Sequence, residues 1–162
     1  SATHNELNLE HGTAYYFSVR ATDGVENVST PGISDGITID TLRPVINLIA
    51  ETASEDPLFP GSDSTIALFW GADDDLSGVE HFEFGLGSSM GATDIVDWTN
   101  AGTDESVVML GMSFDEGSSY YGAIRVFDRA GNMTEAHGDG VMIDITAPET
   151  GTSLDITDLD NS

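Results

Sequence analysis

The chain contains one segment twice, and this internal repeat limits its possible folds more than any other feature. The second copy runs from Gly117 to Pro148, and the first from Gly12 to Pro44. Both copies carry two tyrosines, an arginine, an aspartate, an asparagine, Asp-Gly, Ile-Asp and a proline in the same order. Equivalent residues lie 105 positions apart in the first part of the segment and 104 apart after one loop. A fixed period of this kind indicates an array of similar units.

The period also predicts the domain organisation. Residues 43–147 are expected to form one complete unit. Residues 1–42 would be the closing strands of a preceding repeat, and residues 148–162 the start of a following repeat or a linker. A unit of about 105 residues can bury a hydrophobic core without covalent crosslinks, and the chain has no cysteine. We therefore interpret the chain as part of a longer tandem protein.

Short alternating segments predict that the complete unit is all-β. Apolar and polar residues alternate along them, and Gly, Ser, Thr and Asp interrupt the chain every 8–12 residues or so, which is typical of a sandwich. The fold class we predict is a seven-stranded antiparallel Greek-key β-sandwich. Its strands are expected around residues 45–49, 66–70, 82–86, 95–98, 108–110, 120–126 and 141–143.

Three features carry a resemblance to a known family. Trp70 lies in the predicted second strand, and an apolar residue precedes a tyrosine by six positions at Leu9 and Tyr15 and again at Phe114 and Tyr120. The chain thus resembles fibronectin type III and related bacterial Ig-like tandem repeats of large surface or secreted proteins. The resemblance implies a tyrosine corner, in which the hydroxyl bonds to backbone upstream. It does not define a function, because this architecture supports many unrelated roles.

The charge of the chain excludes some classes of partner. There are 29 acidic residues against four arginines and no lysine, for a formal net charge of −25. Such a chain is repelled by nucleic acid and by anionic membranes, and no apolar run is long enough for membrane insertion. Two interpretations stay open: a solvated acidic surface suited to saline water, or carboxylates that hold metal ions.

An acidic turn after the second predicted strand is the strongest candidate site. Calcium takes six to eight oxygen ligands from carboxylates, carbonyls and water. The turn is not an EF-hand, because Phe84 stands where the closing glutamate would be. In a sandwich of this topology, the turn lies at the same pole as the sixth-to-seventh loop and the preceding joint. The predicted calcium ligands between successive units are Asp40, Asp73, Asp74, Asp75, Asp128 and Asn132.

A structural explanation competes for part of this set. Residues 128–132 read Asp-Arg-Ala-Gly-Asn. In tight turns, Asp and Asn bond to their own backbone and Gly supplies positive φ. The same residues are therefore expected either to close a turn or to hold a cation, and the two roles are compatible.

The sequence contains no convincing enzymatic motif. Residues 32–36 match the Gly-x-Ser-x-Gly string of a nucleophile elbow, which requires a strand, a sharp turn and a helix. Here the string precedes a predicted strand, and the second copy lacks the serine. The four histidines have no zinc-ligand spacing. The chain is therefore expected to be non-enzymatic.

These observations predict a structural or adhesive repeat of an extracellular or cell-surface bacterial protein, such as an adhesin stalk or filament, stiffened by calcium. The expected partners are neighbouring repeats of the same chain or fibre, and surface glycans. The alternative is a carbohydrate-binding or spacer module of a secreted polysaccharide-degrading enzyme, with Tyr16, Tyr121 and Trp98 as a sugar platform. Outward tyrosines that simply cover a sheet face explain the same pattern. Incomplete units at both ends are consistent with a fragment or with strand exchange between molecules.

Overall fold

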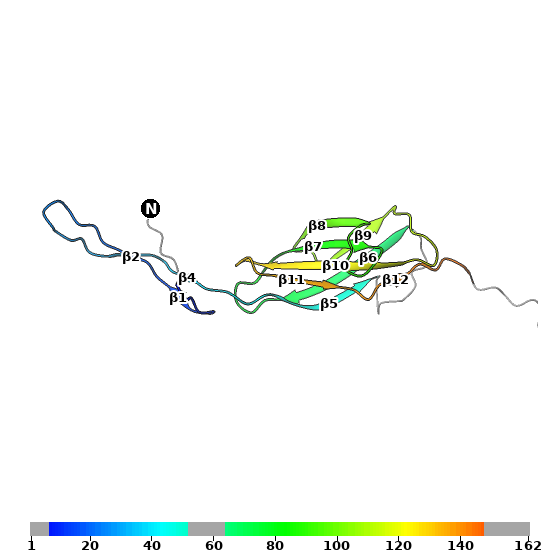
Figure 1. The fold of residues 1–162 in the computed structure, drawn as a ribbon, viewed down its shortest axis with the longest axis horizontal. Coiled ribbons are helices and arrows are strands. Elements are labelled where there is room, and N and C mark those ends of the chain that lie inside the picture. The colour runs from blue at the N-terminus through cyan, green and yellow to red at the C-terminus, as the bar shows by residue number, and fades with distance from the viewer. Residues whose placement is uncertain (1–6, 52–63, 148–162) are drawn as a thin grey trace, which may run out of the picture.

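The computed structural model describes residues 7–51 and 64–147. Within these ranges a β-sandwich occupies one end of the molecule, and a narrow two-stranded ribbon extends from it (Figure 1). The predicted start of a following repeat at residues 148–162 lies outside the described residues, as do residues 52–63 between the first two predicted strands. Among the described residues there is no helix with the length and apolarity needed to cross a bilayer.

The sandwich consists of two antiparallel sheets. The first has the order β5–β6–β9, formed by β5 (Val45–Glu51), β6 (Thr65–Asp73) and β9 (Ser106–Leu110). The second has the order β11–β10–β7–β8, and β12 also pairs with β10. Its strands are β7 (Val79–Gly87), β8 (Val96–Gly102), β10 (Ser119–Asp128), β11 (Met133–His137) and β12 (Val141–Met142).

The strand order confirms the predicted fold class. Strands β11 and β12 pair with opposite ends of β10, so together they form one interrupted strand and the sandwich has seven strand positions. A three-stranded sheet that packs against a four-position sheet, with crossovers between them, is the arrangement of fibronectin type III and Ig-like sandwiches. The predicted resemblance therefore holds at the level of fold.

The core lies between the two sheets and follows from the alternation of each strand. In β10, Tyr120, Ile124 and Val126 are buried, and Arg125 between them is half-buried on the opposite face. Trp70 of β6 is 2% exposed, as its predicted place in the second strand requires. Its ring lies 6.0 and 6.1 Å from two phenylalanine rings of β7. The remaining buried core residues include Ile66, Leu68, Phe82, Phe84, Leu86, Phe114, Val141 and Ile143.

The structure differs from the prediction mainly at strand ends. Strand β7 runs from Val79 to Gly87, beyond both ends of the predicted residues 82–86, because it pairs with β10 along its whole length. Strand β11 (Met133–His137) was not predicted: its sequence is polar, and it lies at the edge of the sheet where half-buried side chains suffice. The seventh strand therefore begins earlier than residue 141.

The ribbon repeats the backbone pairing of the second copy. In it, β1 (Ala14–Tyr15) pairs with β4 (Ile37–Thr38), and β2 (Ser18–Val19) with β3 (Gly32–Ile33). The register Tyr15↔Ile37 is that of the equivalent residues Tyr120↔Val141 in the sandwich. The internal repeat is thus a repeat of structure as well as of sequence.

Both tyrosine corners expected from the resemblance are present. The Tyr120 hydroxyl accepts a hydrogen bond from the backbone N–H of Asp115 at 3.1 Å. In the ribbon, the Tyr15 hydroxyl accepts one from the N–H of Glu10 at 3.0 Å. The two bonds have the same sequence separation, so they fix the entrance to the repeated strand pair in the same way.

Candidate cation site at the joint

The ribbon meets the sandwich at one pole, where three acidic segments converge. Asp40 follows β4 at the end of the ribbon, Asp74 lies in the β6–β7 turn, and Asp128 ends β10. Carboxylate oxygens of these three residues all lie within 4.8 Å of one another. Residues from the ribbon and from two loops of the sandwich therefore share one small volume.

Asp128 is held by the tight turn that follows it. Its side chain is fully buried. One oxygen accepts hydrogen bonds from the N–H groups of Ala130 at 2.9 Å and Asn132 at 2.8 Å. The other accepts one from the Asn132 amide nitrogen at 2.7 Å. This turn is the structural role expected for residues 128–132, and it also fixes the direction of the Asp128 carboxylate.

Asp74 is held on one side only. Its Oδ2 accepts hydrogen bonds from the N–H groups of Gly78 at 2.6 Å and Leu76 at 3.2 Å. Its Oδ1 is buried and has no hydrogen-bond partner among the described residues. Buried carboxylate oxygens are normally satisfied, and an exception needs an explanation such as an ion.

Asp40 joins the ribbon to the sandwich. Its side chain is 2% exposed. Its oxygens accept hydrogen bonds from the N–H of Leu42 at 3.1 Å and the N–H of Ser77 at 3.0 Å. Hydrogen bonding by the Ser77 side chain is the main cause that lowers the pKa of Asp40, with the backbone bonds and His11 as further causes and burial in opposition. Asp40 is therefore an anion at neutral pH.

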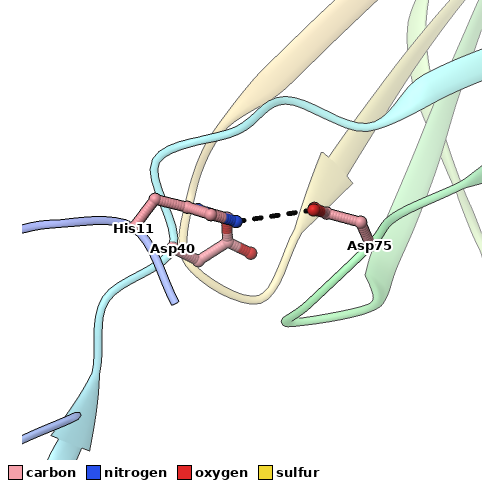
Figure 2. A group of neighbouring side chains, drawn as sticks. All are labelled: His11, Asp40 and Asp75. Carbon is pink, nitrogen blue, oxygen red and sulfur yellow. Dashed lines mark ion pairs between the residues drawn. The ribbon is translucent and has the colours of Figure 1, made fainter. Parts of the chain in front are cut away.

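A second group of side chains shares Asp40. His11 lies between two carboxylates, with its Nδ1 3.3 Å from Asp40 and its Nε2 3.4 Å from Asp75 (Figure 2). These three residues also satisfy the distance condition for a metal ion. The backbone N–H of Thr41 donates a hydrogen bond to Nδ1 at 3.2 Å.

The other two predicted ligands have different positions. Asp73 ends β6, and its carboxylate accepts a hydrogen bond from the Asn47 side chain at 2.8 Å, outside both acidic groups. The side-chain nitrogen of Asn132 donates to Asp128 and, at 3.4 Å, to the carbonyl oxygen of Asp40. Asn132 thus orients the site with its amide nitrogen, while the groups that can hold a cation consist of carboxylates and one imidazole.

The participation of His11 was not predicted, although the repeat contains a signal for it. Its equivalent in the second copy is Glu116, which accepts hydrogen bonds from the N–H of Ile145 at 2.9 Å and the hydroxyl of Thr146 at 3.0 Å. In both copies this position supplies an acceptor to backbone just after the Ile-Asp pair. Comparison of the copies at this position would have indicated His11 as part of the joint.

The three rings of the alternative sugar platform lie in different surroundings. The Arg125 guanidinium lies 3.9 Å above the centre of the Trp98 ring and so covers one face of it. Tyr121 packs against Gly140, where an added Cβ would overlap its ring. Only Tyr16 is widely exposed, at 63%. Of the three rings, Tyr16 is therefore the most open to solvent.

Comparison with known proteins finds similarity in sequence to a much longer protein. No protein-family model matches the chain. The chain is 27% identical over 165 residues to Exoglucanase B of Cellulomonas fimi, a match that covers 95% of this chain and 13% of that protein. The chain thus spans about one eighth of the length of this relative.

Two solved structures are similar at low identity. The PKD1 domain of Vibrio anguillarum Epp has a TM-score of 0.44 and 10% identity, over 66% of this chain and all of that domain. The FN1–FN3 domains of chicken CNTN1 give a TM-score of 0.45 and 14% identity, over 83% of this chain and 46% of that one. The assignment to a β-sandwich rests on the strand order described above.

Proposed function

We propose that this chain is a non-catalytic spacer repeat of an extracellular protein, and that a calcium ion stiffens the joint between successive units. The ion would be bound by Asp40, Asp74 and Asp128. One of these ligands belongs to the ribbon and two belong to the sandwich. A cation shared among them would therefore restrict bending at the point where the two parts meet.

The observation that carries this proposal is the buried Oδ1 of Asp74 in a group of three converging carboxylates. Unit charges 4 Å apart repel by about 4 kcal/mol at the effective dielectric constant of a protein surface. Within the described residues, His11 is the only basic side chain in an ion pair with any of the three. A bound cation would satisfy the free oxygen and offset this repulsion.

The chemistry of the donors favours calcium. The three carboxylates offer hard oxygen ligands, and their mixed origin from a linker and two loops suits an ion that tolerates irregular geometry. Magnesium requires a more regular octahedron. The neighbouring group of His11, Asp40 and Asp75 contains a nitrogen donor, which suits transition metals better than calcium.

Thermal unfolding of the 162-residue chain in a calcium titration tests the proposal. A cation that binds the folded state alone stabilises it by about 2.7 kcal/mol at a concentration one hundred times Kd. We expect the melting temperature to rise with calcium, and Asp74→Asn to remove the rise while it keeps the oxygen that caps the turn. Asp97→Asn, remote from the joint, is the matched control. An equal rise for Asp74→Asn, or none for the wild type at millimolar calcium, contradicts the proposal.

A second candidate is a spacer within a secreted polysaccharide-degrading enzyme. It is favoured by the match to Exoglucanase B along 95% of this chain. Because Arg125 covers Trp98, a spacer role agrees better with the structure than a carbohydrate-binding role. Calorimetric titration with cello-oligosaccharides is expected to give no heat of binding, and binding in the micromolar range would reverse this preference. A catalytic domain elsewhere in the same polypeptide would favour this candidate over an adhesin stalk.

A further inference from the structure

We propose that the apolar face of the ribbon is a docking surface for a three-stranded sheet equivalent to β5–β6–β9. The sheet would be supplied by residues of the same polypeptide that precede this chain. The ribbon face is defined here by Leu9, Tyr15, Val19, Ile37 and Ile39. This inference is independent of the cation, because it rests on exposure and on the internal repeat.

The ribbon face is exposed where its second copy is buried. Val19 is 69% exposed, whereas its equivalent Ile124 is fully buried. Ile37 is 57% exposed, whereas its equivalent Val141 is fully buried. Because the pairing register is the same in both copies, the same face is apolar in each. An exposed contiguous apolar face of this kind indicates an interaction surface.

The face is also hollowed. A cavity of about 300 Å³ is lined by apolar side chains from the ribbon and the segment before it, among them Leu7, Leu9, Tyr15, Phe17 and Ile37. In the second copy, the equivalent face is filled by side chains of the three-stranded sheet, such as Ile66, Leu68 and Met109. The hollow therefore fits side chains of a facing sheet.

One substitution between the copies defines a property of the missing sheet. At Gly122 the second copy leaves room for the carboxylate of Glu51, the last residue of β5, which accepts the Gly122 N–H at 2.8 Å. The first copy has Phe17 at the equivalent position, and its N–H donates instead to the Ser34 hydroxyl at 3.0 Å. The amide is thus satisfied within the ribbon.

The occupant must accommodate Phe17. A Cβ added at Gly122 would meet the Leu68 side chain first and the Glu51 carboxylate next, so a side chain at this position of the ribbon extends toward the facing sheet. The Phe17 amide no longer needs an acceptor from that sheet. The strand equivalent to β5 is therefore expected to carry a small uncharged residue at the position of Glu51. An acidic side chain there would bury a carboxylate against an aromatic ring without a donor, which is costly.

A second copy of this chain is a poorer occupant. Its own three-stranded sheet already packs on its five-stranded sheet through the core, so the described residues offer no uncovered sheet of this type. The relative in Cellulomonas fimi extends far beyond the matched region, since the match covers 13% of it. A preceding segment of the same polypeptide is consistent with both observations.

The test compares the 162-residue chain with the native polypeptide extended at its N-terminus by the length of β5–β9. Hydrogen exchange of Val19 and its neighbours is expected to slow at least a hundredfold in the extended chain. Val19→Asp should destabilise the extended chain and leave the unfolding midpoint of the sandwich unchanged in the shorter one. Val25→Asp, in an exposed loop of the ribbon, is the control.

Three results would overturn the inference. The first is unchanged exchange in the extended chain, and the second is an equal effect of Val19→Asp in both chains. The third is concentration-dependent dimerisation of the shorter chain that Val19→Asp abolishes, which would identify a second copy as the occupant. An acidic residue at the upstream position equivalent to Glu51 would contradict the predicted shape of the facing sheet.

Discussion

The buried carboxylate of Glu51 occupies the space in which residue 138 would place a side chain, and Gly138 leaves that space open. A Cβ built on Gly138 would overlap both carboxylate oxygens. Glu51 comes from β5 of one sheet, and Gly138 lies between β11 and β12 at the edge of the other. The interruption of the seventh strand thus coincides with the insertion of a carboxyl side chain between the sheets.

Gly138→Ala is therefore expected to destabilise the sandwich by about 1–3 kcal/mol, the usual range for overpacking of a well-packed interior. The reason is steric, since the added methyl group must displace a carboxylate that accepts the Gly122 N–H. Urea unfolding followed by tryptophan fluorescence measures the change. Gly24→Ala, where an added Cβ meets nothing within 4 Å, is the matched control and should leave the midpoint unchanged.

The first copy suggests a pair of substitutions that should compensate for each other. There, Ser34 stands at the position of Gly138 and its hydroxyl accepts the neighbouring strand's N–H. The double variant Glu51→Ala with Gly138→Ser should be less destabilised than the sum of its single variants, with a coupling of about 0.5–3 kcal/mol. Strict additivity would show that the two residues do not share the space the structure assigns to them.

The tyrosine corners offer a matched pair of variants. Tyr120→Phe leaves the Asp115 N–H without its acceptor and should lower the free energy of unfolding by about 1 kcal/mol. Tyr15→Phe removes the equivalent bond in the ribbon, outside the sandwich core, and should leave the sandwich midpoint unchanged. Denaturant titration of both proteins separates the two effects. Equal losses would mean that the ribbon and the sandwich unfold as one unit.

The hydrogen bonds of Asp94 predict how the stability of the fold changes at acid pH. Hydrogen bonds from Ser88, first from its hydroxyl and then from its N–H, lower the pKa of Asp94 from its ordinary value of 3.8. A lowered carboxylate pKa stabilises the fold above the unfolded-state pKa, and this contribution is lost as pH falls through the folded-state value. The stability difference between wild type and Asp94→Asn should therefore be constant above about pH 5 and shrink toward pH 2. Ser88→Ala should show the same trend in weaker form, and a difference that grows on acidification would contradict the assignment.

The substitution His11→Glu gives the first copy the residue that the second copy has at the equivalent position, Glu116. The new carboxylate would retain an acceptor for Thr41, as Glu116 does for Ile145, and would add a negative charge beside Asp40. We expect a lower melting temperature in chelator and a larger rise with calcium than in wild type. His11→Gln, which keeps a neutral acceptor, controls for loss of the imidazole. Equal calcium responses of the two variants would show that residue 11 does not face the cation.

Much of the fold could be predicted from the sequence, because the repeat and the period-2 alternation are local signals. The tyrosine corners were implied by the resemblance to fibronectin type III repeats, and the buried Trp70 followed from its strand. Strand β11 (Met133–His137) could not be found this way: its edge position leaves no apolar face to detect. Glu51 was equally hidden, because its partner Gly122 is 71 residues away in the chain.

The candidate site was also predicted only in part. Topology predicted that the acidic turn, the joint and the sixth-to-seventh loop meet at one pole. It did not distinguish Asp73 from Asp74 and Asp75, because the sequence does not show at which of three consecutive acidic residues the strand ends. Asp73 is the last residue of β6 and bonds to Asn47 of the neighbouring strand, so only its successors turn toward the joint. Which of these aspartates faces the joint therefore depends on the last residue of β6 that pairs with β5, which is Asp73 opposite Val45.

The ribbon and strand β12 lie at opposite ends of the molecule (Figure 1). A pull applied along the chain would therefore run lengthwise through the sandwich. It would load the six residue pairs of β5–β6 and the two of β10–β12 in shear. The joint would carry the same load through Asp40. Resistance to such a force is set by the rate of unfolding. Contacts at the joint, including a bound cation, would therefore lengthen the time the sandwich survives under load as well as raise its equilibrium stability.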